Sequence, residues 1–247
     1  MNRKRNPIFQ VMSLGVVLLG LTTFLRAQTA PPSEPLTPYG TALLDYKTGK
    51  YDEARAAIDV AEKTNPGDIQ TEILKARILT ELGDFAGGEQ ILRPLLTETG
   101  PLDVQLALGD LLLRKRSFDR AAKYYTLALQ AKPDDPDVIL KLVYAKIGAS
   151  DLVGAGQYAS RLKPLDPKNP YDDHASYYFA KAALAQATGN TQAADDDIQN
   201  ARTVYGITVT NRYLKTYLEI FSSSDKTPSS DITPPPLVKP TPANSKP

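Results

Sequence analysis

Small side chains recur along this sequence at an almost constant interval. Ala54, Gly88, Ala121, Ala155 and Ala194 are separated by 34, 33, 34 and 39 residues. A repeat of about this length, with apolar residues at three- and four-residue spacing, is typical of an array of helix pairs. Because one such pair cannot bury its own apolar face, the units are expected to stack into one continuous core. The interval therefore predicts an all-α fold.

The third unit, LDVQLALGDLLLRKRSFDRAAKYYTLALQAKPDD, shows the pattern most clearly. It resembles the tetratricopeptide repeat, and the positions that carry the resemblance are Leu108, Gly109, Leu112, Phe118, Ala121, Tyr125, Ala128 and Pro133. The other units keep many of these positions. The resemblance implies a right-handed α-solenoid of about five helix-turn-helix units with a C-terminal capping helix.

The resemblance also divides the chain into regions. The solenoid is expected over residues 35–223, with units at about 35–68, 69–101, 102–135, 136–169 and 175–208 and the capping helix at 211–223. Residues 28–34 are interpreted as a disordered tether. Residues 224–247 contain seven prolines and few large apolar side chains, so they are interpreted as a disordered tail, either a spacer or a docking peptide.

Turn residues support the proposed helix boundaries. Gly49, Gly83 and Gly189 stand where the first helix of a unit is expected to stop, because glycine adopts a positive φ at little cost. The predicted N-caps of the second helices are Asp84, Ser117, Asp151 and Asn190.

The N-terminus has the three-part pattern of a secretory signal. Basic residues near position 4 precede an uncharged apolar run from Val11 to Leu25, and small residues follow. We predict a signal peptide at residues 1–27, cleaved after Ala27. The alternative is an uncleaved anchor, and only then is membrane association expected. In either case the remaining chain is expected to be exported, either periplasmic or secreted.

Composition excludes several classes of function. Lys and Arg total 29 and Asp and Glu total 28, and all charges among the first 27 residues are basic, so the remainder has a net charge of −3. Nucleic-acid binding is therefore not expected. The chain has no cysteine and a single histidine, His174, without a nucleophile motif to accompany it. We expect no catalytic residues, no metal site, no cofactor and no small-molecule substrate.

The resemblance implies that the first helices of the units line a concave groove that binds protein partners. The residues placed toward this groove are Tyr39, Leu43, Tyr46, Ile73, Arg77, Leu106, Asp110, Arg114, Tyr144 and Phe179. The function expected is a non-catalytic scaffold or adaptor of the cell envelope that holds a peptide or helix of a partner. A self-associating structural component, or an accessory subunit of an envelope enzyme or secretion complex, remains open.

The signal interpretation predicts that the exported chain begins at Gln28. N-terminal sequencing of the protein recovered from the envelope fraction of the producing cell measures this directly. A chain that still begins at Met1 in that fraction contradicts cleavage and supports the anchor.

Overall fold

The computed structural model describes residues 36–96, 101–166 and 174–221. The chain divides into residues 1–35 and residues 36–247, and all described residues belong to the second unit. The predicted signal peptide 1–27, tether 28–34 and tail 224–247 lie outside the described residues.

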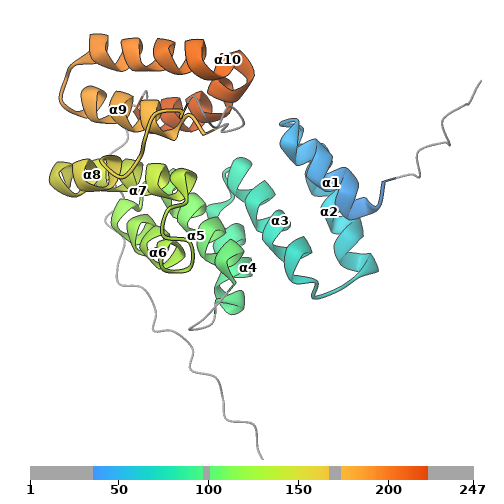
Figure 1. Ribbon diagram of the computed structural model, residues 1–247. Helices are drawn as coiled ribbons and strands as arrows, with labels where there is room; N and C mark the ends of the chain where they lie inside the picture. The colour runs from blue at the N-terminus through green and yellow to red at the C-terminus, as the bar shows by residue number, and fades with distance from the viewer. Residues whose placement is uncertain (1–35, 97–100, 167–173, 222–247) are drawn as a thin grey trace, which may run out of the picture. The chain divides into compact units, whose positions relative to one another are not determined.

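The described residues form an all-α solenoid, as the sequence predicts, and no strand occurs among them (Figure 1). The helices are α1 (Pro38–Lys47), α2 (Tyr51–Thr64), α3 (Ile69–Glu81), α4 (Phe85–Leu95), α5 (Leu102–Arg114), α6 (Phe118–Ala131), α7 (Pro136–Gly148), α8 (Leu152–Ala159), α9 (Ser176–Ala187) and α10 (Thr191–Phe221). Helices that follow one another along the chain pack in pairs, beginning with α1 against α2 and α3 against α4. No helix of this described part is long and apolar enough to span a lipid bilayer.

Small residues let the two helices of a pair approach closely. A Cβ placed on Gly88 of α4 would lie 3.1 Å from the carbonyl oxygen of Ala76 on α3, so the α4 backbone lies directly on α3. In the first pair, Ala42 and Ala54 are fully buried. The repeated small residue therefore marks the line along which each helix pair closes.

Most of the predicted N-caps form. The side chain of Asp84 accepts the N–H of Gly87 at 2.9 Å, and that of Asp151 accepts the N–H of Gly154 at 2.8 Å. Asn190 accepts the N–H of Ala193 at 3.1 Å. The expectation for Ser117 is wrong, because its hydroxyl makes no cap hydrogen bond and is buried without a hydrogen-bond partner among the described residues.

The core consists of two clusters that meet at α3. The smaller cluster joins α1, α2 and α3 through residues such as Ile58 and Ile78. The larger cluster begins on α3 at Ile73 and continues through α10. Stacking of neighbouring units thus produces a core that runs along the array, as expected for repeats that contact mainly their neighbours.

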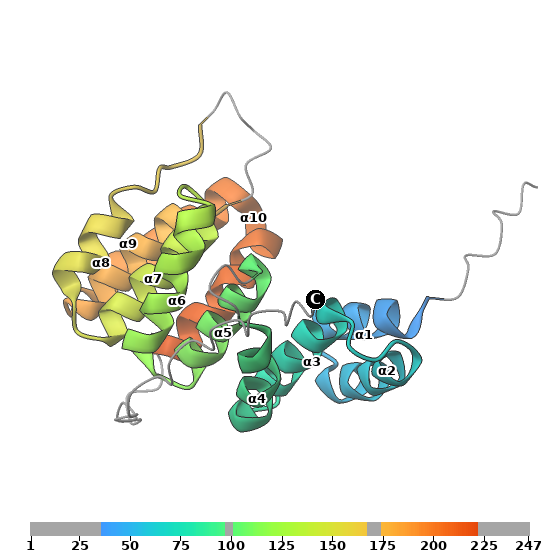
Figure 2. The ribbon, with the colours of Figure 1, turned by 90° about the horizontal axis from the view of Figure 1, so that it is seen from below.

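The last helix differs from its predicted form. Gly206, inside α10, has φ 76° and ψ 171°, a backbone region that is essentially restricted to glycine. The break divides α10 into residues 191–205, which complete the fifth pair, and residues 207–221, named here the C-terminal segment. The C-terminal segment follows Gly206 directly, before the predicted start at residue 211, and runs back beside α9 and α5 (Figure 2).

The packing of α5 on α6 predicts that Gly109→Ala destabilises the protein. A Cβ at Gly109 would lie 2.6 Å from a ring carbon of Tyr125, which is fully buried. We expect a loss of about 1–3 kcal/mol in the free energy of unfolding, measured by thermal or urea denaturation. The control is Gly156→Ala in α8, where a Cβ meets nothing within 4 Å and a gain of up to about 1 kcal/mol is expected. Equal effects of the two substitutions would contradict this account of the pair interface.

Candidate partner-binding groove

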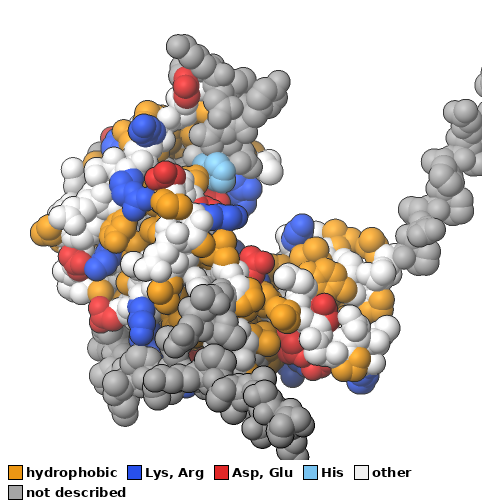
Figure 3. Space-filling model, turned by 60° about the horizontal axis from the view of Figure 1, so that its bottom comes forward, with side chains coloured by type: hydrophobic (Ala, Val, Ile, Leu, Met, Phe, Trp, Pro, Cys, Tyr) orange, Lys and Arg blue, Asp and Glu red, His pale blue; other side chains and the backbone are white. Residues whose placement is uncertain are grey.

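Four of the ten residues predicted for the groove line one pocket. Tyr46 on α1, Arg77 on α3, and Asp110 and Arg114 on α5 surround a cavity of about 180 Å³. Its lining is completed by Thr80, Glu81, Ala107, Leu113, Lys141 and Thr216. Figure 3 shows the hollowed face of the molecule, where acidic and basic side chains lie among hydrophobic ones.

The other six predicted residues lie elsewhere on the first helices. Tyr39 and Leu43 are partly buried against the smaller core cluster, and Leu106 is partly buried against the larger one. Ile73 belongs to the core, with 3% of its surface exposed. The remaining two, Tyr144 and Phe179, lie beneath the C-terminal segment. The partner-binding role of all ten residues stays a prediction.

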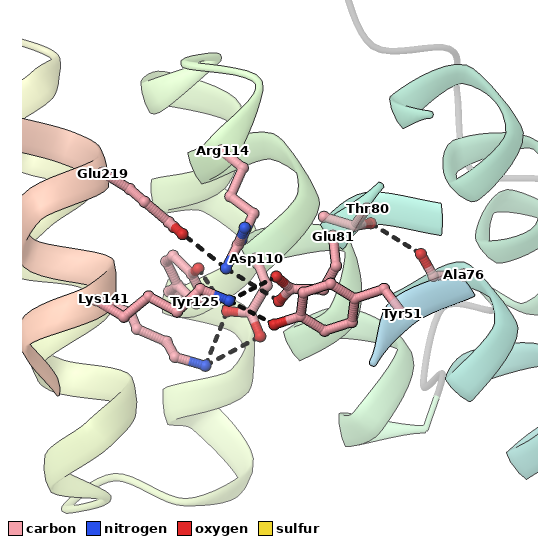
Figure 4. Close-up of polar contacts among 10 residues, drawn as sticks. Tyr51, Ala76, Thr80, Glu81, Asp110, Arg114, Tyr125, Lys141 and Glu219 are labelled. Atoms are coloured by element: carbon pink, nitrogen blue, oxygen red, sulfur yellow. Dashed lines mark hydrogen bonds and ion pairs between the residues drawn. The ribbon is translucent and has the colours of Figure 1, made fainter. Parts of the chain in front are cut away.

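Ion pairs occupy much of the pocket (Figure 4). Nη2 of Arg114 lies 2.9 Å from Oε1 of Glu81 and 3.1 Å from Oε2 of Glu219. Nζ of Lys215 lies 2.9 Å from Oε2 of Glu81 and donates to the hydroxyl of Tyr51. The side chain of Glu81 is only 10% exposed, so its charge is neutralised by two cations from different helices.

Asp110 is also engaged. It accepts a hydrogen bond from the Tyr125 hydroxyl at 2.8 Å, and Nζ of Lys141 lies 2.8 Å from the same carboxyl oxygen. Burial, followed by the charge of Asp110, raises the pKa of Tyr125 well above its usual value, so the hydroxyl remains a donor. Both contacts fix the Asp110 carboxylate in place.

Arg77 differs from the other cations of the pocket. Nε of Arg77 is buried and has no hydrogen-bond partner among the described residues. Arg114 and Lys141, in contrast, each pair with a carboxylate. Close to Arg77, burial and the charge of Glu81 raise the pKa of Tyr46 to about 12, which keeps its hydroxyl protonated and able to donate. The pocket therefore presents donors without a matching acceptor.

Sequence reasoning missed several lining residues. Glu81 stands four residues after Arg77, and Lys141 three residues before Tyr144, so helical spacing from the predicted residues would have found both. No local pattern indicates that Lys215 and Thr216 enter the groove.

The C-terminal segment covers the groove over α7 and α9. The ring of Tyr213 stacks on Phe179 with centroids 5.5 Å apart, and Phe221 contacts Tyr144 edge to face at 5.6 Å. Phe179 is 0% exposed and Tyr144 is 1% exposed. Neither side chain is accessible to a partner while the segment is in place.

Comparison with known proteins agrees with this architecture. A family model described as a tetratricopeptide repeat matches residues 73–136, which cover most of α3 and all of α4 to α6. A thermophilic tetratricopeptide-repeat protein of Thermus thermophilus has the same fold, with a TM-score of 0.58 over 73% of this chain and 97% of that one. Residues 73–136 match the tetratricopeptide repeat, and the described residues have the fold of a tetratricopeptide-repeat solenoid. This fold indicates a scaffold that binds other proteins.

The proteins that resemble this chain in fold or in part of the sequence are distant from it. The Thermus protein is 19% identical, and a repeat protein from Parabacteroides merdae is 14% identical, with a TM-score of 0.57 over 73% of this chain and 70% of that one. Human protein O-mannosyl-transferase TMTC1 is 31% identical over 136 residues, which is 54% of this chain. The chain spans only 15% of the length of TMTC1.

Cations neutralise the acidic side chains that line the pocket, Glu81 and Asp110. Among the described residues, no three His, Asp or Glu side chains come together as metal ligands would.

Asp137 on α7 predicts a dependence of stability on pH. Burial alone would raise its pKa, but hydrogen bonds from the hydroxyls of Tyr213 and Ser176, at 2.7 and 2.9 Å, and the nearby His174 lower it below the ordinary 3.8. A lowered pKa in the folded state contributes stability above about pH 4, and this contribution is lost as the pH falls through the lowered value.

We therefore expect Tyr213→Phe to lower the free energy of unfolding by about 1 kcal/mol at pH 5, a modest loss because Asp137 is partly exposed. The loss is expected to be smaller at pH 3, because protonation of Asp137 weakens the hydrogen bond that it accepts from Tyr213. Calorimetry at both pH values measures the difference. Tyr217→Phe on the same segment, where the structure shows no hydrogen bond to Asp137, is the control. The same loss at pH 3 as at pH 5 would contradict the assignment.

Proposed function

We propose that this protein is a non-catalytic scaffold that binds a segment of a protein partner in the pocket formed by α1, α3, α5 and α7. The observation that carries this proposal is that Arg77 lines the pocket and that its buried Nε has no hydrogen-bond partner in the described part of the chain, while Glu81 and Asp110 are already paired. A buried donor without an acceptor costs free energy, and a carboxylate that binds the Arg77 guanidinium in the pocket would offset part of this cost.

The pocket favours a carboxylate as that group. Arg77 can donate to two carboxyl oxygens, and the Tyr46 hydroxyl is a neutral donor beside it. Asp or Glu side chains and a free C-terminus all present this chemistry. A partner peptide that carries a carboxylate among apolar residues therefore fits the pocket.

The proposed place of action is the cell envelope. Its support is the basic and apolar N-terminal sequence, which has the pattern of an export signal. A scaffold role in the envelope includes the case of an accessory subunit that positions an enzyme encoded elsewhere. The transferase activity in the name of TMTC1 is a property of that protein, and pairing of the groove carboxylates supports a non-catalytic role here.

Reversal of the charge at Arg77 tests the proposal. Arg77→Glu is expected to weaken partner binding by about tenfold or more, because one charge-assisted contact is lost and a repulsion is introduced. The measurement is cross-linking in cells and affinity capture from the envelope fraction, with quantitative mass spectrometry of recovered proteins. The captured partner's affinity is then measured with purified chains.

The matched control is Arg55→Glu on α2, which reverses the charge of an exposed cation outside the pocket. Proteins recovered equally with wild type and the control but lost with Arg77→Glu support the pocket. Equal recovery of every protein with all three chains excludes it.

A further inference from the structure

The C-terminal segment lies in the groove as a bound helix would. It contacts side chains of α2, α3, α5, α7 and α9, and the residues it touches are separated from it by up to 164 positions in sequence. Thr216, near its middle, lines three separate cavities, so open space remains along the segment. Helix-in-groove docking is a general mode of peptide recognition.

Aromatic residues at four-residue spacing form its buried edge. Tyr213 and Tyr217 contact Phe179 with ring centroids 5.5 and 6.0 Å apart, and Phe221 contacts Tyr144. Tyr213 and Tyr217 are 7% and 5% exposed. Aromatic side chains are large, so these contacts bury a substantial apolar surface of the segment.

Charged residues form a second edge. Lys215 pairs with Glu81, and Glu219 pairs with Arg114, which joins the segment to α3 and α5. The side chains of Lys215 and Glu219 are 47% and 34% exposed. Glu81 and Arg114 are only 10% and 21% exposed, and the four charges form one network, so these pairs hold the helix in place as well as set its register.

The covalent connection between the C-terminal segment and the helix pairs runs through Gly206. Gly206 breaks α10, and the fifth helix pair is already complete in α9 and residues 191–205. Departure of the segment therefore breaks no helix of the array. What it exposes is the aromatic surface of Tyr144 and Phe179.

We propose that the C-terminal segment is a releasable internal ligand, and that the surface beneath it is the docking site for an amphipathic helix of a partner. That helix carries aromatic residues at positions i, i+4 and i+8, together with a basic and an acidic residue for Glu81 and Arg114. The proposal rests on the proposed function as a protein-binding scaffold, and it names a second, aromatic half of the same groove. Because the internal ligand is tethered at Gly206, its high effective concentration lowers the apparent affinity of the partner.

A synthetic peptide of residues 207–221, ITVTNRYLKTYLEIF, is the probe. The full chain is prepared as wild type and as Lys215→Ala/Glu219→Ala, in which the internal ligand loses both charged contacts while the surface beneath it is unchanged. Fluorescence anisotropy is expected to show at least tenfold tighter binding of the labelled peptide to the double variant. Leu218→Ala, at a position 45% exposed on the same helix, is the control and is expected to bind like wild type.

Equal affinity for wild type and the double variant would overturn the proposal. So would undiminished binding of a peptide with alanine at Tyr213, Tyr217 and Phe221. Light scattering accompanies each titration. A dimer of the double variant in the absence of peptide would overturn the proposal, because it would indicate that two copies exchange their C-terminal segments. Arg77→Glu is expected to leave binding of the 207–221 peptide unchanged. A negative result in this peptide titration is therefore distinct from a negative result in the capture experiment that tests the pocket beside Arg77.

Hydrogen exchange distinguishes a releasable segment from a fixed cap. Only a releasable segment is expected to exchange its amides faster while the rates in α7 and α9 stay unchanged. In the double variant, amides of residues 207–221 are expected to exchange at least tenfold faster than in wild type, while those of α7 and α9 keep their rates. Equal acceleration in α7, α9 and the segment would show one cooperative unit and would overturn the proposal.

Discussion

The close contact between the two helices of each pair is the constraint on which the rest depends. At Gly88 the backbone of α4 lies against the backbone of α3, and at Gly109 the ring of Tyr125 fills the space that a side chain would take. These contacts place each first helix at a set position on its partner. The inner surface, its pocket and its ion pairs then follow from which residues the first helices turn inward.

Helix pairs can be predicted from the sequence because their requirements are local and repeated. A small residue about every 34 positions, with a capping side chain such as Asp84 or Asp151 ahead of the second helix, specifies one unit without reference to the others. The local rules fail where packing overrides them. Arg116 and Ser150 take a positive φ in turns where glycine is expected, and Ser117 does not cap α6.

The groove is only partly predictable for a physical reason. Arg77, Asp110 and Arg114 converge because they occupy corresponding faces of neighbouring repeats, which the period determines. The C-terminal segment has no such determinant. Its spacing of Tyr213, Tyr217 and Phe221 identifies an apolar helix face but not the surface that receives it, because that surface comes from residues up to 164 positions away.

The chemistry of the inner surface explains why only part of it is covered. The first helices of units two and three present Arg77, Glu81 and Asp110, and ion pairs satisfy both carboxylates, so this part keeps an open pocket without an apolar cover. The first helices of units four and five present Tyr144 and Phe179, and a groove of exposed aromatic rings favours aggregation. The C-terminal segment covers these rings while it remains attached through Gly206, and the pocket beside Arg77 stays open.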